Sequence, residues 1–248
     1  MIILKNTQEI AMMRESNRIL AQLFEHIAPM IQPGITTAEL DSEAELFIRS
    51  LNAVPAFKGY RGFPATLCTS VNEAVVHGIP SERRLVSGDI ISIDVGALFN
   101  GFYSDAARTF PVGEVSKQAQ ALMDATRQAL AAGISQAYPG NRLSDISSAI
   151  QQVVESAGFS VVRDFVGHGI GKGLHEDPQI PNFGKKGNGP VLKEGMTFAI
   201  EPMVNKGSWK VTICEDGWTA VTSDGSLSAH FEDSIAITKH GPLILSAL

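Results

Sequence analysis

The chain has 248 residues and a formal net charge of -6 at pH 7, with 44% hydrophobic and 19% charged residues. This composition is typical of a globular protein, and the length suffices for a substantial core. The sequence has no run of Lys or Arg that would indicate binding to nucleic acid or to an anionic membrane. It also has no apolar stretch near the roughly 18 residues needed to span a bilayer.

The start, "MIILKNTQEI", lacks the regions of a signal peptide. Cys68 and Cys214 lack metal-site spacing. We therefore expect a cytoplasmic protein with reduced thiols.

The first part of the chain begins with helical patterns. An amphipathic helix is predicted over about 7 to 30, with its N-cap at Asn6 or Thr7. A second helix should start at a capping box formed by Thr36 and Glu39. Together they predict a helical pair before the first strands.

A similar pattern recurs later in the chain. Ser116 is expected to cap a helix over 117 to 137. Segments 32 to 53 and 138 to 159 each place a Pro-Gly pair before a helical pattern. Chance could explain so weak a similarity. If it is real, two pseudo-symmetric halves combine their strands in one sheet, with helices on one face and the chemistry on the other. The halves would be about 1–110 and 111–248 of one catalytic domain.

Between these helical pairs, residues 90 to 110 read as two strands around a tight turn. Asn100 and Gly101 tolerate the positive φ angles that a two-residue hairpin turn needs. The incoming strand alternates apolar and polar residues, which is typical of a strand with one buried face. The sequence therefore predicts an antiparallel hairpin.

That hairpin carries two aspartates. Its register places Asp94 opposite Ala107 and Asp105 opposite Gly96, so both carboxylates project from one face, with Cα atoms roughly 7–8 Å apart. Two surface aspartates on a solvated face would fit the pattern equally well. The small partners favour a site instead, because they leave room beside carboxylates that would repel each other without a cation.

Further polar residues interrupt glycine-rich or apolar segments downstream. "DFVGHGIGKGLHEDPQIPN" (164 to 182) contains His168 and His175 among glycines that permit close approach. The glycine spacing does not match a dinucleotide-binding fingerprint. Glu201 interrupts "MTFAIEPMV", and Glu232 interrupts "SAHFEDSIAIT". A core histidine and edge-strand glutamates are the alternatives, but a carboxylate inside an apolar strand is costly unless it is paired or binds a metal.

The candidate metal ligands are four carboxylates and one imidazole, all in strand-like or glycine-rich segments: Asp94, Asp105, His168, Glu201 and Glu232. Two divalent cations would balance about four negative charges. The donor set suits Mn, Fe, Co or Zn better than a thiolate-loving ion.

These residues occur in the segments "VNEAVVHGIP", "GDIISIDVGA", "GHGIGKGLHEDP", "GMTFAIEP" and "SAHFEDSIAIT". These segments, in this order, closely resemble the corresponding segments of the type I methionine aminopeptidases, a family with the pita-bread fold. The resemblance covers essentially the whole chain. It implies an α+β architecture with a pseudo-twofold axis, in which helices cover one face of a curved antiparallel sheet.

The resemblance also implies a role for each ligand. Asp94 should chelate one cation with both oxygens, and Asp105 and Glu232 should bridge the two cations. His168 and Glu201 should complete the second site. Glu201 should also move the proton of the attacking water.

Further residues are implied to bind substrate. His77 and His175 match two histidines that flank the scissile peptide bond, and both are expected to be catalytic. Two positions depart from the family pattern: Leu174 stands where many relatives carry an aromatic residue, and Asp233 stands where a histidine is frequent. The methionine pocket is expected at or near Phe57, Tyr60, Phe63, Cys68, Leu174 and Trp218.

The activity implied by the resemblance is removal of the initiator methionine from nascent polypeptides whose second residue is small. We expect a monomer that contacts the ribosome transiently. Two alternatives share the fold: a proline-specific aminopeptidase and a non-catalytic binding protein. Relatives of the second kind typically lose metal ligands, whereas all five positions are filled here.

Overall fold

The computed structural model describes residues 1–247. Its helices are α1 (Thr7–Ile27), η1 (Ala28–Met30), α2 (Thr37–Ser50), η2 (Tyr60–Gly62), α3 (Lys117–Ile134) and α4 (Leu143–Ser156). Its strands are β1 (Val54–Pro55), β2 (Leu67–Val71), β3 (Ala74–Val76), β4 (Ile90–Phe99), β5 (Phe102–Pro111), β6 (Ser160–Val161), β7 (Gly167–Gly169), β8 (Glu176–Ile180), β9 (Thr197–Ile200), β10 (Met203–Asn205), β11 (Val211–Ile213), β12 (Ala220–Thr222), β13 (Ser228–His230), β14 (Asp233–Thr238) and β15 (Gly241–Ile244). Within residues 1–247, no helix combines the length and apolar character needed to cross a membrane.

The predicted helix starts are confirmed. Asn6 caps α1, and Glu9 completes a capping box. The Thr36–Glu39 capping box begins α2, and Ser116 caps α3 by accepting a hydrogen bond from a backbone N–H. Each such cap satisfies N–H groups that have no partner within the helix.

Two predicted helix ends are wrong by three residues. The helix α1 ends at Ile27 instead of residue 30, where the chain tightens into a 3₁₀ turn containing Pro29. The helix α3 ends at Ile134 instead of residue 137, shortly before Pro139. Proline lacks the N–H that a continuing helix would use, which accounts for the end of α1. After Ile134 the chain instead forms tighter turns, in which the N–H groups of Gln136 and Ala137 donate to the carbonyls three residues earlier.

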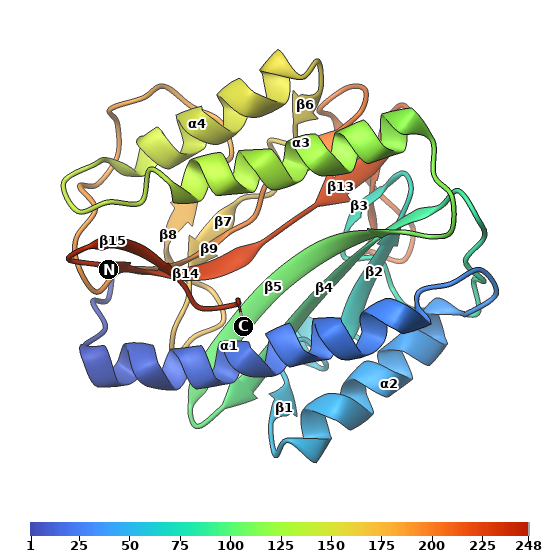
Figure 1. Ribbon diagram of the computed structural model, residues 1–248, viewed down its shortest axis with the longest axis horizontal. Helices are drawn as coiled ribbons and strands as arrows, with labels where there is room; N and C mark the ends of the chain where they lie inside the picture. The colour runs from blue at the N-terminus through green and yellow to red at the C-terminus, as the bar shows by residue number, and fades with distance from the viewer. Residues whose placement is uncertain (248) are drawn as a thin grey trace.

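The strands pair in antiparallel fashion throughout residues 1–247. One sheet has the order β1-β4-β2, with β5 also paired to β4, and another has the order β15-β14-β9-β7-β8. Two smaller sheets, β13-β10-β6 and β11-β12-β3, lie beyond them. A bridge between Ala107 and Glu232 links the first two sheets, which run side by side in Figure 1.

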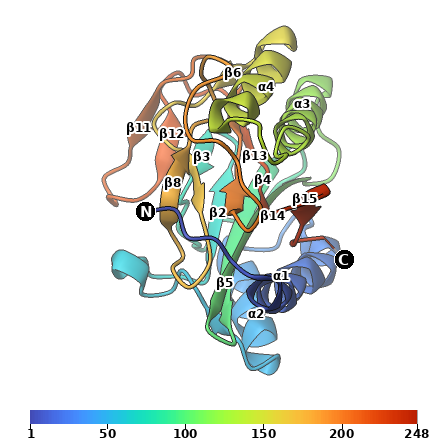
Figure 2. The ribbon, with the colours of Figure 1, turned by 90° about the vertical axis from the view of Figure 1, so that its left-hand side faces the viewer.

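The long helices lie on one side of these sheets, as the turned view in Figure 2 shows. The helices α1 and α2 pack on the β4–β5 sheet, and α3 packs on β9 and β13 with α4 against it. Ile91, Ile93 and Val95 of β4 join the core beneath α1 and α2. Because side chains alternate along a strand, Asp94 points to the opposite face. The α+β class with helices on one face is therefore confirmed. The boundary between halves near residue 110 stays a prediction.

Candidate metal centre and active site

The hairpin β4–β5 has the predicted register. Phe99 pairs with Phe102 around the turn, Asp94 with Ala107, and Gly96 with Asp105. Directly paired residues share a face, so both aspartates project from the face that the helices do not cover. One strand further across the sheet, Cys68 of β2 pairs with Asp94.

Glu232 reaches the same face from the other end of the chain. It precedes β14 and forms an antiparallel bridge with Ala107, whose other neighbour is Asp94. The backbone N–H of Glu232 donates to the carbonyl of Ala107 at 2.9 Å. Asp94, Ala107 and Glu232 therefore form a row across three strands, with the methyl group of alanine between two carboxylates.

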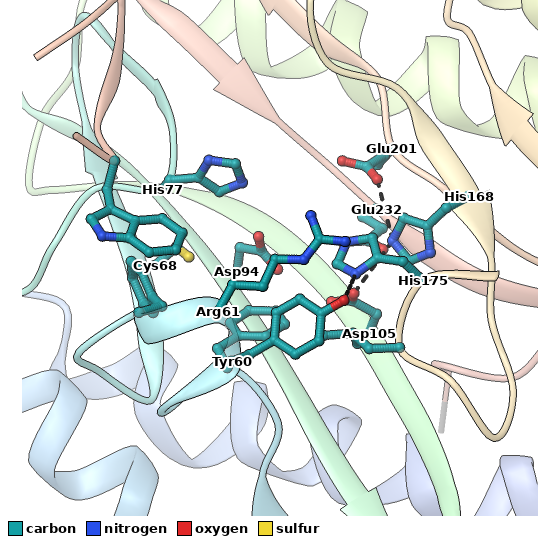
Figure 3. A pocket seen from close by; sticks show the side chains of 14 residues that line it. Tyr60, Arg61, Cys68, His77, Asp94, Asp105, His168, His175, Glu201 and Glu232 are labelled. Carbon is teal, nitrogen blue, oxygen red and sulfur yellow. Dashed lines mark hydrogen bonds and ion pairs between the residues drawn. The ribbon is translucent and has the colours of Figure 1, made fainter.

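His168 and Glu201 complete the cluster. His168 lies in the middle of β7 and pairs with Ala199 of β9, and Glu201 follows β9 directly. The Nε2 atom of His168 lies 3.6 Å from Asp105 Oδ2 and 3.6 Å from Glu201 Oε1. Ligand atoms of Asp105, His168 and Glu232 all lie within 4.8 Å of one another. All five predicted ligands line one cavity (Figure 3).

This cluster contains more acidic than basic groups. Burial raises the pKa of Asp94 and of Glu232 well above the ordinary range, and neighbouring carboxylates raise both further. Burial also raises the pKa of Asp105. Burial alone would lower the pKa of His168, but Asp105 and Glu201 outweigh it and raise that pKa to about 9. The protein has gathered acids that cannot all ionise without a positive partner.

The unpaired atoms of the cluster fit divalent cations. Asp94 Oδ1, Asp105 Oδ1 and Glu232 Oε1 are buried without a hydrogen-bond partner among residues 1–247. The ring of His168 donates from Nδ1 to the carbonyl of Gly169 at 2.9 Å, which leaves Nε2 free to act as a ligand. Carboxylate and imidazole donors of this kind accept Mn, Fe, Co or Zn.

Two histidines stand beside this cluster without joining it. His175 contacts the hydroxyl of Tyr60 through Nδ1 at 2.9 Å, and its ring lies 4.3 Å from that of His168, centroid to centroid. Burial lowers the pKa of His175 to about 4, and the charge of His168 contributes. His77 lies edge-on to the rings of Phe165 and Trp218, and burial lowers its pKa as well. Both imidazoles are therefore neutral near pH 7.

A cavity of about 160 Å³ opens onto the cluster of carboxylates and His168. The apolar part of its wall contains an edge-to-face pair, Phe63 and Trp218, with ring centroids 5.2 Å apart. Burial raises the pKa of the Cys68 thiol well above its usual value, so this side chain behaves as an uncharged, polarizable group. All six residues predicted for the methionine pocket line this cavity: Phe57, Tyr60, Phe63, Cys68, Leu174 and Trp218.

The glycines around His168 permit the close packing of its strand, as predicted. A Cβ atom on Gly167 would lie 2.4 Å from the carbonyl oxygen of Ala199, and one on Gly169 would lie 2.2 Å from that of Asp177. Both distances are far below contact, so only glycine brings His168 this close to β9 and β8.

This packing predicts that Gly167→Ala lowers the free energy of unfolding by about 1–3 kcal/mol, the usual cost of overpacking. For a chain of this size, each kcal/mol shifts Tm by roughly 2–4 °C. Gly173→Ala is the matched control, because its Cβ would meet the nearest atom at an ordinary 3.4 Å. Thermal denaturation of both variants measures the difference. Equal stability would show that β7 has room to move.

The environment of Asp233 explains why an acid stands at this position. Arg108 donates to the carbonyl of Glu232 and, at 2.6 Å, to Asp233 Oδ1. Ser246 also donates to Asp233 Oδ1, at 2.6 Å. Asp233 therefore anchors the arginine that holds the backbone of Glu232. It does not reach the cavity.

Two further residues of the site were not predicted from the sequence. His230 is buried, and its Nε2 lies 3.6 Å from Glu201 Oε2. Its place two residues before Glu232 in a strand pattern was the available signal. Arg61 also lines the cavity, with its guanidinium 5.4 Å from the centre of the Tyr60 ring. No local pattern around Arg61 indicates this position.

The sequence profile of Metallopeptidase family M24 matches residues 11–239. The chain belongs to this family, and it is accordingly a metal-dependent peptidase. It is 56% identical over 248 residues to the methionine aminopeptidase of Clostridium perfringens, covering 100% of both chains. It is 54% identical to methionine aminopeptidase 1 of Bacillus subtilis, covering 99% of both. The crystal structure of methionine aminopeptidase from Thermotoga maritima superimposes with a TM-score of 0.98 at 48% identity, covering 100% of both chains.

Proposed function

We propose that this protein hydrolyses the peptide bond after an N-terminal methionine when the second residue is small. The observation that carries the proposal is that the cluster of carboxylates and His168 lines the same cavity as a set of apolar side chains. An apolar wall with polarizable groups suits a thioether side chain. The carboxylates beside it suit cations that would also attract the free α-amine of a substrate. This arrangement favours an exopeptidase.

Asp94, Asp105, His168, Glu201 and Glu232 would hold two divalent cations. Cations held there would polarise the scissile carbonyl and lower the pKa of water in the site. Mn, Fe, Co and Zn all suit the donor set, and we leave the choice among them to metal analysis.

Glu201 is suited to carry the proton. Its two carboxylate oxygens face His168 and His230, each at 3.6 Å, which keeps the group at the edge of the cluster. From there it would take a proton from the attacking water and pass one to the leaving amine. His230 would orient Glu201 for both transfers.

His175 is suited to stabilise the carbonyl oxygen as it gains negative charge. Its imidazole is neutral near pH 7 because burial lowers its pKa to about 4. If the Tyr60 hydroxyl donates to Nδ1, the ring proton resides on Nε2 and can be donated to substrate. His77, on the opposite side of the cavity in Figure 3, would contact the backbone of the second residue.

Substrate preference tests the proposal. Met-Ala-Ser should be cleaved at least about 100-fold faster, in kcat/KM, than Leu-Ala-Ser or Met-Lys-Ser. The first comparison tests the thioether pocket, and the second tests the space beyond the scissile bond. Liberated amino acid is measured by chromatography.

Three outcomes would overturn this proposal. Equal rates on all three peptides would indicate a general aminopeptidase. Preferential release of residues that precede proline, measured with Met-Pro-Ser and Leu-Pro-Ser, would favour a proline-specific enzyme. Absence of all cleavage by metal-loaded protein would indicate a binding protein.

We also propose that the protein acts in the cytoplasm as a monomer on nascent chains. The formal net charge of -6 at pH 7 is compatible with this setting. A transient contact with the ribosome would bring it to its substrate.

A further inference from the structure

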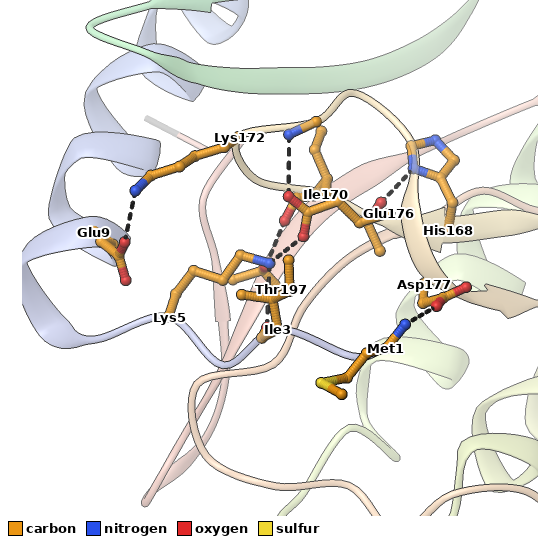
Figure 4. Close-up of polar contacts among 12 residues, drawn as sticks. Met1, Ile3, Lys5, Glu9, His168, Ile170, Lys172, Glu176, Asp177 and Thr197 are labelled. Carbon is orange, nitrogen blue, oxygen red and sulfur yellow. Dashed lines mark hydrogen bonds and ion pairs between the residues drawn. The ribbon is translucent and has the colours of Figure 1, made fainter.

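A buried ion pair lies beneath the loop that carries His175 and has no part in the mechanism above. Lys5, which precedes α1, contacts Glu176 Oε2 through its ammonium group. The side chains are only 4% and 10% exposed. The two residues are 171 positions apart, so the pair fastens the start of the chain to the active-site loop (Figure 4).

Lys5 is itself held firmly. Its backbone N–H donates to the carbonyl of Gly195 at 2.7 Å, just before β9. Its ammonium group also donates to the carbonyl of Ile3 at 3.2 Å. The lysine is thus fixed to the sheet that carries His168, and it presents its charge at a defined point.

Glu176 connects Lys5 to the backbone of the active-site loop. Its second oxygen, Oε1, accepts a hydrogen bond from the backbone N–H of Gly173 at 3.0 Å. The carboxylate therefore closes a short turn from Gly173 to Glu176, and His175 lies inside that turn. Leu174, the other residue in the turn, lines the methionine pocket.

Gly171 supplies a second sign that the ion pair and the loop fit together closely. A Cβ atom at this position would lie 2.5 Å from Lys5 Cε and 2.7 Å from Glu176 Oε1. The carbonyl of Gly171 also accepts a hydrogen bond from the backbone N–H of Tyr103 of β5 at 2.8 Å. A side chain at this position would therefore displace the end of Lys5 or of Glu176.

A buried ion pair is weak evidence for stability, because desolvation offsets most of its attraction. Its effect on geometry is stronger, since two buried charges that have few other partners hold the groups around them in place. We propose that Lys5 and Glu176 are positioning residues that hold His175 in place for transition-state contact. This inference rests on the proposed function of His175.

The test is a double-mutant cycle on Met-Ala-Ser cleavage with Lys5→Met, His175→Ala and the double variant. Misplacing a catalytic group by a fraction of an ångström to an ångström costs roughly 10- to 100-fold in rate. Lys5→Met should therefore lower kcat about 10-fold or more in the parent. It should lower kcat less than about 2-fold in the His175→Ala background, because no imidazole remains to be displaced. Bound metal should be unchanged in all four proteins.

Lys172→Met is the matched control. Lys172 leaves the same loop but forms its ion pair with Glu9 at the surface, at 3.3 Å, with its side chain 70% exposed. Its loss should leave kcat within about 2-fold of the parent, as expected for an exposed pair. If Lys5→Met does not fold, Gly171→Ala takes its place, because the added methyl group disturbs the ion pair from the opposite side. It should give the same pattern of kcat values that is expected for Lys5→Met.

Hydrogen exchange supplies a readout that does not depend on the activity. Amides in residues 171–176 should exchange faster in Lys5→Met than in Lys172→Met or the parent. An equal fall in kcat in both backgrounds of the cycle, or unchanged exchange in this loop, would overturn the positioning role. A parent that exchanges as expected but cleaves no Met-Ala-Ser would refute the proposed function instead.

Discussion

Replacing Glu232 by alanine should release at least one divalent cation and reduce peptide cleavage to background. Glu232 Oε1 is buried without a hydrogen-bond partner among residues 1–247, so its expected partner is a cation. Removing one carboxylate from the cluster takes away both a ligand and a compensating charge. Because changes around a metal ligand already cost 10- to 100-fold in affinity, loss of the ligand should cost more than about 100-fold.

Elemental analysis after dialysis measures the bound metal, and cleavage of Met-Ala-Ser measures the activity. Glu232→Gln is the control for size, since it keeps the shape of the side chain and removes the charge. It should also bind metal more weakly than the parent. Full metal content in Glu232→Ala would mean that Glu232 is no ligand and that its burial has another cause.

His175→Ala should lower kcat by roughly 10²–10³-fold while the metal content stays normal. The imidazole lies beside the cluster, and its Nδ1 is engaged by Tyr60 at 2.9 Å. A contact that strengthens only in the transition state affects kcat, so KM should change little. Single-turnover cleavage and elemental analysis separate this outcome from that of Glu232→Ala.

Tyr60→Phe refines the test of His175. It removes the hydroxyl that contacts Nδ1 and keeps the aromatic ring in the cavity wall. The resulting loss of orientation should lower kcat about 10-fold, which is less than loss of the imidazole itself. Parental turnover by His175→Ala, or loss of its metals, would show that the assigned role is wrong.

Local sequence patterns were enough to predict the hairpin that carries two of the site residues. The Asn100-Gly101 turn determines the hairpin register, and the register places Asp94 and Asp105 on one face. This inference needed only the period of the strand and the chemistry of the turn. The glycines beside His168 likewise indicated the close backbone approach that the structure shows.

Other features depend on contacts between distant parts of the chain. Glu232 joins the hairpin carboxylates through a bridge to Ala107, 125 positions earlier as the numbering shows, and no local pattern encodes that pairing. The same limit applies to Lys5 and Glu176. For Glu232, the resemblance to known enzymes supplied the role of a bridging ligand, which periodicity could not.

His230 was missed for a different reason. A single histidine in a strand pattern is compatible with an ordinary core residue, and its contact with Glu201 becomes visible only when β13 and β9 are in place. The predicted helix ends lay beyond Ile27 and Ile134 because the helical pattern of the sequence continues into the tighter turns that follow both helices.

The central claim is that the clustered carboxylates and His168 bind the cations on which hydrolysis of the N-terminal methionine depends. The most direct measurement is anaerobic titration of chelated, dialysed protein with Mn or Co, with bound metal and Met-Ala-Ser cleavage followed in the same samples. We expect no cleavage at zero metal, and cleavage that rises with bound metal until the site is filled. Full turnover by metal-free protein would contradict the claim.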